Sequence, residues 1–220
     1  MFDSATVSMI MKGIGETLYM TLFSSILAYV IGLPLGVILV TTDKDGITPM
    51  PTVNKVLGFI INMLRSVPFI ILLITVLPFT KFVVGTTLGC NATVVPLVIA
   101  SAPYIARLVE SSLKEVDGGV IEAAQSMGAR PFQIVTKVLI PEAKPSLLVG
   151  AAIAVTTILG YSAMSGFVGG GGLGNIAINY GYYRYKTGIM FVTVAILVVI
   201  VQVFQELGIR LSKGTDKRVR

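Results

Sequence analysis

The stretch from Ile189 to Phe204 reads IMFVTVAILVVIVQVF and contains no charged residue, and similar apolar runs recur along the 220-residue chain. A helix needs about 20 mainly apolar residues to cross a hydrocarbon core of about 30 Å. Inside a bilayer only helices or closed barrels satisfy their own backbone hydrogen bonds, and these runs lack the alternation of barrel strands. The sequence therefore predicts an all-α integral membrane protein with about five transmembrane helices.

The composition also points to the bilayer as the solvent. Hydrophobic residues make up 54% of the chain and charged residues 13%, about half the share found in an average soluble domain. The net charge of +6 would suit a nucleic-acid-binding protein as well, so the placement of the basic residues has to decide. The N-terminus lacks the basic segment and cleavage site of a signal peptide, and we expect the first span to stay in the mature protein.

Five apolar regions are separated by polar, turn-rich segments. The second region contains Arg65 followed by Ser66-Val67-Pro68, so it is either one helix or two pieces broken at the proline. One membrane domain over residues 13–211 is expected, followed by a tail over residues 212–220. The expected spans are Glu16 or Thr17 to Val40, Val56 to Pro78, Ala92 to Arg107, Ser146 to Met164, and a last span that ends near Leu211.

The 17 basic residues fix the orientation of these spans. Five spans place the termini on opposite sides of the membrane. One side then holds Lys12, Lys81, Arg184 and Lys186. The other holds Lys44, Lys55, Arg107, Lys114, Arg130, Lys137, Lys144, Arg210, Lys213, Lys217, Arg218 and Arg220, with Arg65 unassigned. Basic residues gather on the cytoplasmic side, so the N-terminus is predicted outside and the C-terminus in the cytoplasm. Topology explains the positive charge, and no nucleic-acid partner is expected.

A cytoplasmic loop between the third and fourth regions, from Glu110 to Pro145, is too charged for hydrocarbon and has helical periodicity in two short pieces. Gly128 is expected to stop the first piece in a left-handed conformation. Pro131 is expected to open the second, and Pro141 and Pro145 to end it. The predicted apolar faces hold Val120, Ile121, Ala124 and Met127 in the first piece, and Phe132, Val135, Val138 and Leu139 in the second.

Three interpretations of this loop stand side by side on its residues alone. The small Ala123 and Ala124 beside Glu122 leave a low surface that another protein can approach closely. Two helices joined by a glycine turn are also typical of a DNA-binding helix-turn-helix, although the short tether between two spans argues against it. A hairpin lying on the membrane surface is the third.

The spacing within the loop resembles a known family. Glu122-Ala123-Ala124, Gly128 after three further residues, and Val138-Leu139-Ile140-Pro141 after nine more resemble the EAA loop of ABC importer permeases. The family pattern closes with Ile-x-Leu-Pro, from which Val138 and Ile140 are conservative departures. In that family the loop forms a coupling helix that sits in a cleft of a cytoplasmic ATPase. The resemblance thus implies a coupling role for Glu122, Ala123, Ala124, Gly128 and Pro141.

The resemblance covers about Gly13 to Leu211 and looks like the permease of bacterial methionine importers. It is carried by RSVPFIILL from Arg65, VPLVIASAPYIARLVE from Val95 and GYSAMSGFVGGGGLGNIAINYGY from Gly160. It implies a type I ABC importer permease fold and import of D- and L-methionine across the bacterial cytoplasmic (inner) membrane. The implied partners are a second copy of the chain, two ATPase subunits, an extracytoplasmic methionine-binding protein and membrane lipid.

No cofactor is expected in the chain itself. It contains no Gly-Lys-Ser/Thr sequence, so ATP hydrolysis is expected in the partner subunit and the chain is not predicted to be an enzyme. Gly169, Gly171 and Gly174 match G-x-G-x-x-G, but the strand and helix of a dinucleotide site are not predicted around them. These glycines suit a tight re-entrant turn, a close contact with another subunit, or an unspecialised loop.

Four residues are candidates for a pathway or gate: Arg65, Ser162, Met164 and Ser165. Arg65 is expected in a polar or wet environment, or at the cytoplasmic edge of a span that starts at Pro68. The other three lie at the outer end of the fourth span and suit helix packing as well as a gate. Gly32 and Gly36, four residues apart, favour close approach of a neighbouring helix.

Two rival functions remain at this point. A secondary transporter normally carries intramembrane carboxylates, whereas Glu16 and Glu206 lie near the ends of their spans. The second rival is an importer of the same class that carries another amino acid or a short peptide. The sequence leaves it open, because no substrate pocket can be assembled from the sequence of one chain.

Overall fold

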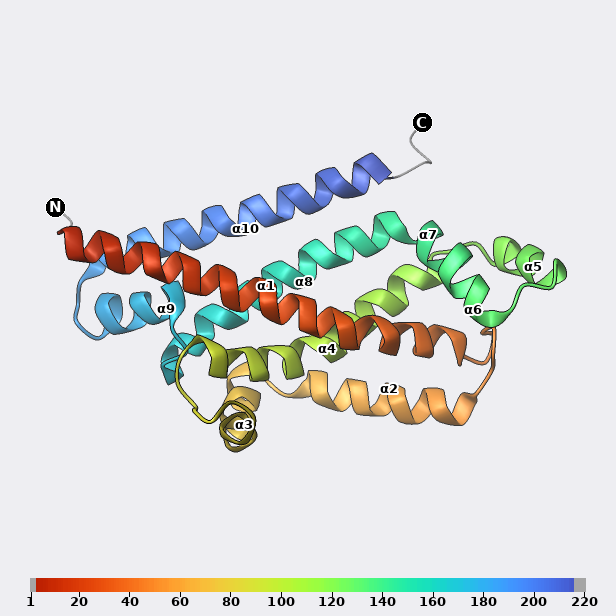
Figure 1. Ribbon diagram of the computed structural model, residues 1–220, viewed down its shortest axis with the longest axis horizontal. Helices are drawn as coiled ribbons and strands as arrows, with labels where there is room; N and C mark the ends of the chain where they lie inside the picture. The colour runs from red at the N-terminus through yellow and green to blue at the C-terminus, as the bar shows by residue number, and fades with distance from the viewer. Residues whose placement is uncertain (1–2, 216–220) are drawn as a thin grey trace. The chain divides into compact units, whose positions relative to one another are not determined.

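The computed structural model describes residues 3–215, and every regular element in that range is a helix (Figure 1). Four helices are long and apolar enough to cross a membrane, because the shortest of them has 25 residues and a crossing needs about 20. They are α1 (Ser4–Thr41), α4 (Cys90–Lys114), α8 (Lys144–Met164, continued by a 3-10 turn over Ser165–Val168) and α10 (Thr187–Thr215). The prediction of an all-helical membrane protein is confirmed.

The second apolar region is broken rather than continuous. Helix α2 (Pro51–Ser66) and helix α3 (Phe69–Val84) meet at an angle of 105°. Pro68 lies at the break, where its missing N–H and fixed backbone angle end one helix and allow the next to begin. With this pair taken as one crossing, the chain has five spans, as predicted. Lys114, at the end of α4, contacts Asp43 of the loop that joins α1 to α2 at 2.9 Å, so both lie on one side of the membrane, which requires the pair α2–α3 to cross it.

Short elements connect the long helices. They are α5 (Gly118–Ser126), α6 (Pro131–Ile134), the π-helical stretch Val135–Leu139, α7 (Ile140–Glu142), α9 (Gly172–Ile176) and the π-helical stretch Ala177–Tyr182. Figure 1 shows α5, α6 and α7 following the end of α4, between the long helices α4 and α8. They form the cytoplasmic loop that the sequence predicted.

The described residues fall into two compact units, one built from residues 3–28, 67–101 and 155–205, the other from residues 29–66, 102–154 and 206–215. In the second unit, Leu39, Ile61 and Ala106 form a buried cluster that joins α1, α2 and α4. Gly32 and Gly36 bring α1 against α4: a Cβ at Gly36 would lie 2.6 Å from the Ala106 carbonyl oxygen. The close approach predicted for this glycine pair is confirmed.

Two of the expected spans were shorter than the helices in the structure. Helix α1 begins at Ser4 instead of Glu16 or Thr17, and α4 continues beyond Arg107 to Lys114. In both places charged residues had marked the end of a hydrophobic run. These side chains pair along the same helix face, Lys12 with Glu16 and Glu110 with Lys114, so the helix continues through them. Residues 216–220 of the predicted tail lie outside the described range.

Candidate functional site

The cytoplasmic loop begins with α5, a helix with well-formed caps. The Asp117 carboxylate accepts a hydrogen bond of 2.7 Å from the Gly119 N–H at its start. At its end Gly128 has a φ of 77°, its N–H bonds to the Gln125 carbonyl, and the Ala129 N–H bonds to the Ala124 carbonyl. This pair of hydrogen bonds is a Schellman motif. The predicted left-handed role of Gly128 is confirmed.

The second half of the loop differs from the prediction. Pro131 opens α6, as expected, and the Arg130 N–H is bound by the Gln133 side chain. Pro141 was expected to end this helix, but it lies inside α7, directly after the π-helical stretch Val135–Leu139. A proline within a helix leaves the carbonyl of the preceding turn without its donor, and the wider π geometry next to it accommodates that loss. The chain therefore remains helical through the proline.

The loop exposes apolar side chains at its tip. Met127 is 82% exposed and Phe132 is 77% exposed, so the chain itself does not cover the predicted apolar faces at these two positions. The side chains that anchor the loop are instead Ala124, Ile134 and Leu139. Of the two alanines expected to face a partner, only Ala123 is exposed. Exposed apolar residues of this size at the end of two short helices are typical of a protein-docking surface.

Glu122 lies beside a cleft of about 350 Å³ between α5 and the loop that joins α1 to α2. Ile121, Glu122 and Gln125 line it from α5, whereas Asp43 and Lys114 line the opposite side. The described residues hold no group of three potential metal ligands, so the carboxylates of this cleft do not form a metal site. Glu122 itself is exposed and free to meet a partner.

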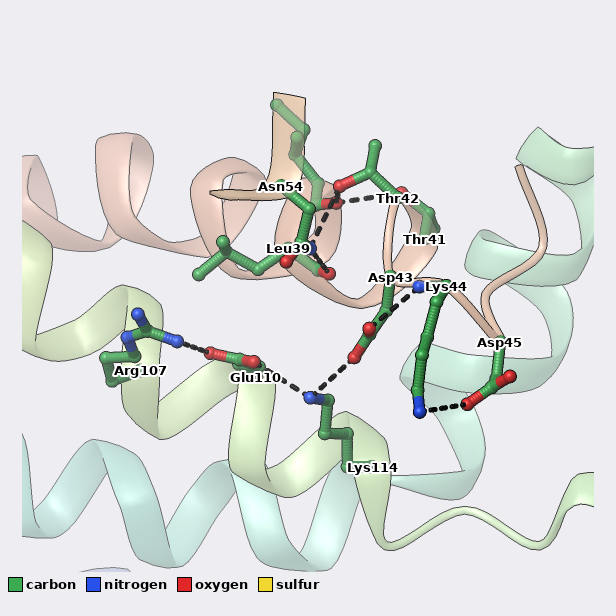
Figure 2. Close-up of polar contacts among 11 residues, drawn as sticks. Leu39, Thr41, Thr42, Asp43, Lys44, Asp45, Asn54, Arg107, Glu110 and Lys114 are labelled. Carbon is green, nitrogen blue, oxygen red and sulfur yellow. Dashed lines mark hydrogen bonds and ion pairs between the residues drawn. The ribbon is translucent and has the colours of Figure 1, made fainter. Parts of the chain in front are cut away.

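A chain of charged residues at the cytoplasmic end of α4 was missed in the sequence (Figure 2). Arg107 binds Glu110 at 2.6 Å, Glu110 binds Lys114 at 3.0 Å, and Lys114 binds Asp43 of the α1–α2 loop at 2.9 Å. We call these four residues the charge chain. The spacing of its three α4 members, three and then four residues, was the available signal, because residues so spaced share one helix face.

The electrostatics of the charge chain are visible at Asp43, which lies outside the spans. The Lys114 ammonium that bonds to its carboxylate lowers the pKa of Asp43 below its ordinary value, and a hydrogen bond of 2.8 Å from the Lys44 N–H adds to this effect. Both contacts stabilise the charged form of the carboxylate. Asp43 is therefore ionised, and paired with Lys114, at neutral pH.

Arg65 lies near the end of α2, 14 residues after Pro51 and so about 21 Å along the helix from the loop that joins α1 to α2. With α2 and α3 taken as one crossing that begins at Pro51, Arg65 lies within the crossing and not at its cytoplasmic edge. The guanidinium lies over the Tyr104 ring, 5.9 Å from its centroid, at cation–π distance. Its neighbour is thus an aromatic face of α4.

The structure places two of the other gate candidates in helix packing. Ser162 and Ser165 are buried, and their hydroxyls donate to carbonyl oxygens of the same helical segment at 2.7 and 2.6 Å. Each hydroxyl is satisfied locally and faces no open route. Met164, between them, is about half exposed. The burial of both serines favours helix packing for them. The side chain of Met164 is accessible at this end of α8.

The glycine-rich segment is fastened to α1 instead of forming a nucleotide site. The Glu16 carboxylate accepts a hydrogen bond of 2.8 Å from the Gly172 N–H, and the Thr17 hydroxyl accepts one of 2.9 Å from the Leu173 N–H. Gly171 and Gly172 have φ values of 88° and 73°, which only glycine adopts without strain. Glu16 thus has a structural partner, and the expectation of a tight turn is confirmed.

Helical spans, a bent helix pair and a capped cytoplasmic loop with an exposed tip define a membrane permease of the kind driven by a separate subunit. Residues 32–213 match the family of binding-protein-dependent transport system inner membrane components. The chain belongs to this family, and the match begins later than the domain expected from residue 13.

Individual relatives are similar over nearly the whole chain. A probable D-methionine transport system permease protein MetI of Vibrio cholerae is 49% identical, covering 92% of this chain and 90% of the relative. A methionine import system permease protein MetP of Bacillus subtilis is 45% identical, with 92% and 91% covered. A solved chain of the MetNI methionine ABC transporter in an inward-facing conformation is 43% identical, with a TM-score of 0.97 over 98% of this chain and all of that one.

Proposed function

We propose that this chain is the membrane-spanning subunit of an ATP-driven importer that carries D- and L-methionine across the bacterial inner membrane. The substrate is inferred from sequence similarity: the chain is 45–49% identical, over more than 90% of its length, to permeases named for D-methionine or methionine. Likeness confined to the cytoplasmic loop would support only the class of transporter, because that loop resembles importers of many substrates.

The geometry supports an energy source outside the chain. The cytoplasmic loop presents Met127, Phe132 and Glu122 at its surface, on two short helices held together by the Gly128 cap. A rigid, exposed element of this kind can transmit force from a docked protein to the helices on either side of it. We therefore propose two ATPase subunits as partners, with ATP bound by them.

A second copy of this chain and an extracytoplasmic methionine-binding protein complete the proposed assembly. Large apolar side chains remain exposed along α10, among them Phe191, Val199 and Leu211. Such surfaces are suited to lipid or to a neighbouring membrane helix. ATP binding would shift the population of such an assembly between inward-open and outward-open states, through the loops that the ATPases hold.

Competition for uptake tests the substrate. Cells whose only methionine importer contains this chain should take up labelled methionine, and unlabelled D- or L-methionine should compete better than histidine or glutamate. Matched cells without the chain measure background uptake. A stronger effect of histidine or glutamate would assign another amino acid, and uptake that persists without an ATPase would indicate a secondary transporter.

A further inference from the structure

The charge chain joins α4 to two parts of the second unit that are distant from it in sequence, α2 and the α1–α2 loop. Arg107 reaches α2, where its guanidinium donates to the Gly58 carbonyl at 3.1 Å and to the Asn62 side chain at 2.9 Å. Glu110 and Lys114 continue along α4, and Asp43 receives the last contact in the α1–α2 loop. A continuous path of short polar contacts thus runs from α2 to that loop.

Burial makes this path different from ordinary surface ion pairs. The side chains of Glu110 and Arg107 are only 12% and 25% exposed. A buried charge is unfavourable unless it is paired, so the loss of one member leaves its neighbour uncompensated. The members are therefore expected to stay together or to exchange partners together, which gives the path discrete arrangements instead of gradual ones.

One end of the path meets the element that would receive force from the ATPase. Asp43 and Lys114 line the cleft whose other side is formed by Ile121, Glu122 and Gln125 of α5. At the other end, α2 leads toward Arg65 and the Pro68 break, where the helix pair bends. Lys114 is the last residue of α4, and only three residues separate it from the start of α5, so a displacement of α5 reaches the Asp43–Lys114 contact first and the Arg107–Glu110 pair next.

We propose that Asp43, Lys114, Glu110 and Arg107 are positioning residues that make α2 move together with α5, and so couple nucleotide-driven motion of the loop to the membrane helices. This proposal rests on the proposed function, because it assigns a role within an ATP-driven importer. Lys114 is the exchange point, since its ammonium is shared between Asp43 at 2.9 Å and Glu110 at 3.0 Å.

The first test measures substrate transported per ATP hydrolysed, with the complete complex and its binding protein in proteoliposomes. Lys114→Met and Asp43→Asn should assemble and hydrolyse ATP, but the transport ratio should fall at least about fivefold, the lower range of typical coupling effects. In the double variant the transport ratio should fall no further than in either single variant, because Lys114→Met and Asp43→Asn remove the same contact. Lys114→Arg should keep the wild-type ratio, because it keeps the positive charge. The matched control is Lys44→Met, because Lys44 is an exposed cation in the same loop as Asp43.

The second test needs no substrate. Spin labels on cysteines at Ser126 of α5 and Val53 of α2, in a Cys90→Ala background, report the distance between the two helices. In the wild type this distance should stay the same with and without ATP, because the helices move together. In Lys114→Met it should change when ATP binds. A wild type without methionine uptake would refute the proposed substrate, and this measurement would still decide the coupling.

Each contrary outcome overturns the inference. An unchanged transport ratio in an assembled Asp43→Asn complex would show that the contact carries no force, and an equal loss in Lys44→Met would show a general charge effect. Failure of both single variants to assemble would assign these residues to structure alone. An α5–α2 distance that changes with ATP in the wild type would show that the two helices move independently.

Discussion

Gly128 and Glu122 have separate roles at the scale of single residues. Gly128 holds a backbone angle that a side chain disfavours, whereas Glu122 contributes an exposed carboxylate next to a cleft. The first is a requirement of shape and the second of charge. Substitutions at the two positions should therefore weaken the same interaction in different ways.

Gly128→Val should strain the left-handed turn by about 1–2 kcal/mol and misplace α6. We expect subunit association and transport to fall while the spans remain folded, because the turn lies outside them. Copurification of the ATPase, together with uptake, measures both effects. Gly188→Val is the control, since Gly188 has an ordinary φ and no atom within 4 Å of an added Cβ. Equal behaviour of the two variants would contradict a specific role for this turn.

Glu122→Ala should weaken association with the ATPase at least about tenfold, the weight of one charge-assisted hydrogen bond. The control is Asp3→Ala, an exposed carboxylate at the other end of the chain. Lys114→Ala would be a poor control, because Lys114 belongs to the charge chain. Association that is unaffected in Glu122→Ala would remove this residue from the docking surface.

Asp43 gives the stability of the second unit a defined pH dependence. Its pKa in the folded chain lies below the ordinary 3.8, mainly because of Lys114, so folding favours the ionised form. The contribution should be fully present above about pH 5 and lost as the pH falls through the folded pKa, below about 4. Thermal unfolding of the wild type and Asp43→Asn in detergent should differ by a constant amount from pH 5 to 8. The two should converge in acid, and a difference that grows in acid would contradict this sign.

At the scale of elements, the contact between α1 and α4 depends on two missing side chains. An added Cβ at Gly36 would meet both the Ala106 carbonyl and the Val109 side chain at 2.6 Å, so the helices would have to move apart. Gly36→Ala should therefore destabilise the protein by about 1–3 kcal/mol, as overpacking does in other tight interfaces. Denaturant unfolding in mixed micelles measures the difference.

Gly15→Ala is the matched control for this contact. Gly15 lies in the same helix, and nothing lies within 4 Å of a Cβ built there. This change should be neutral or stabilise by up to about 1 kcal/mol, because alanine restricts the unfolded chain more than glycine does. Equal destabilisation by both substitutions would show that the crossing with α4 does not set the effect.

Local pattern predicted the elements well where one short segment decides the structure. Gly128 and Pro131 follow from backbone preferences of single residues, and these predictions were confirmed. The break at Pro68 was one of two possibilities that the sequence left open, and the structure shows it. The end expected at Pro141 lies one residue later, because α7 continues through the proline to Glu142. Helical periodicity predicted the apolar face that holds Phe132, but it does not show whether the chain itself covers such a face.

At the scale of the whole molecule, the sequence could not show partners that are distant along the chain. The contact between Asp43 and Lys114 spans about 70 residues, and that between Glu16 and Gly172 spans 156. In a sequence these side chains are simply charges at the ends of hydrophobic runs. The fold class and the number of spans were predictable, because they follow from the thickness of the bilayer.

The orientation predicted from charge can be tested on whole cells. In a Cys90→Ala background, a membrane-impermeant maleimide should label Tyr185→Cys from outside, because Tyr185 is exposed before α10 on the predicted outer side. Lys44→Cys, in the loop after α1, should react only after permeabilisation. The reverse pattern would invert the topology. Labelling of both from one side would contradict an odd number of spans.

The π-helical stretch Val135–Leu139 makes this region of the gene able to lose a codon. Each hydrogen-bonded ring there holds one residue more than in an α-helix, so the stretch acts as a one-codon insertion. Deleting one of these codons would restore α-helical winding and leave the helix register downstream unchanged, whereas a deletion in a regular α-helix such as α5 turns everything downstream by about 100°. In a codon-deletion library selected for uptake, single deletions within Val135–Leu139 should therefore survive more often than single deletions within α5.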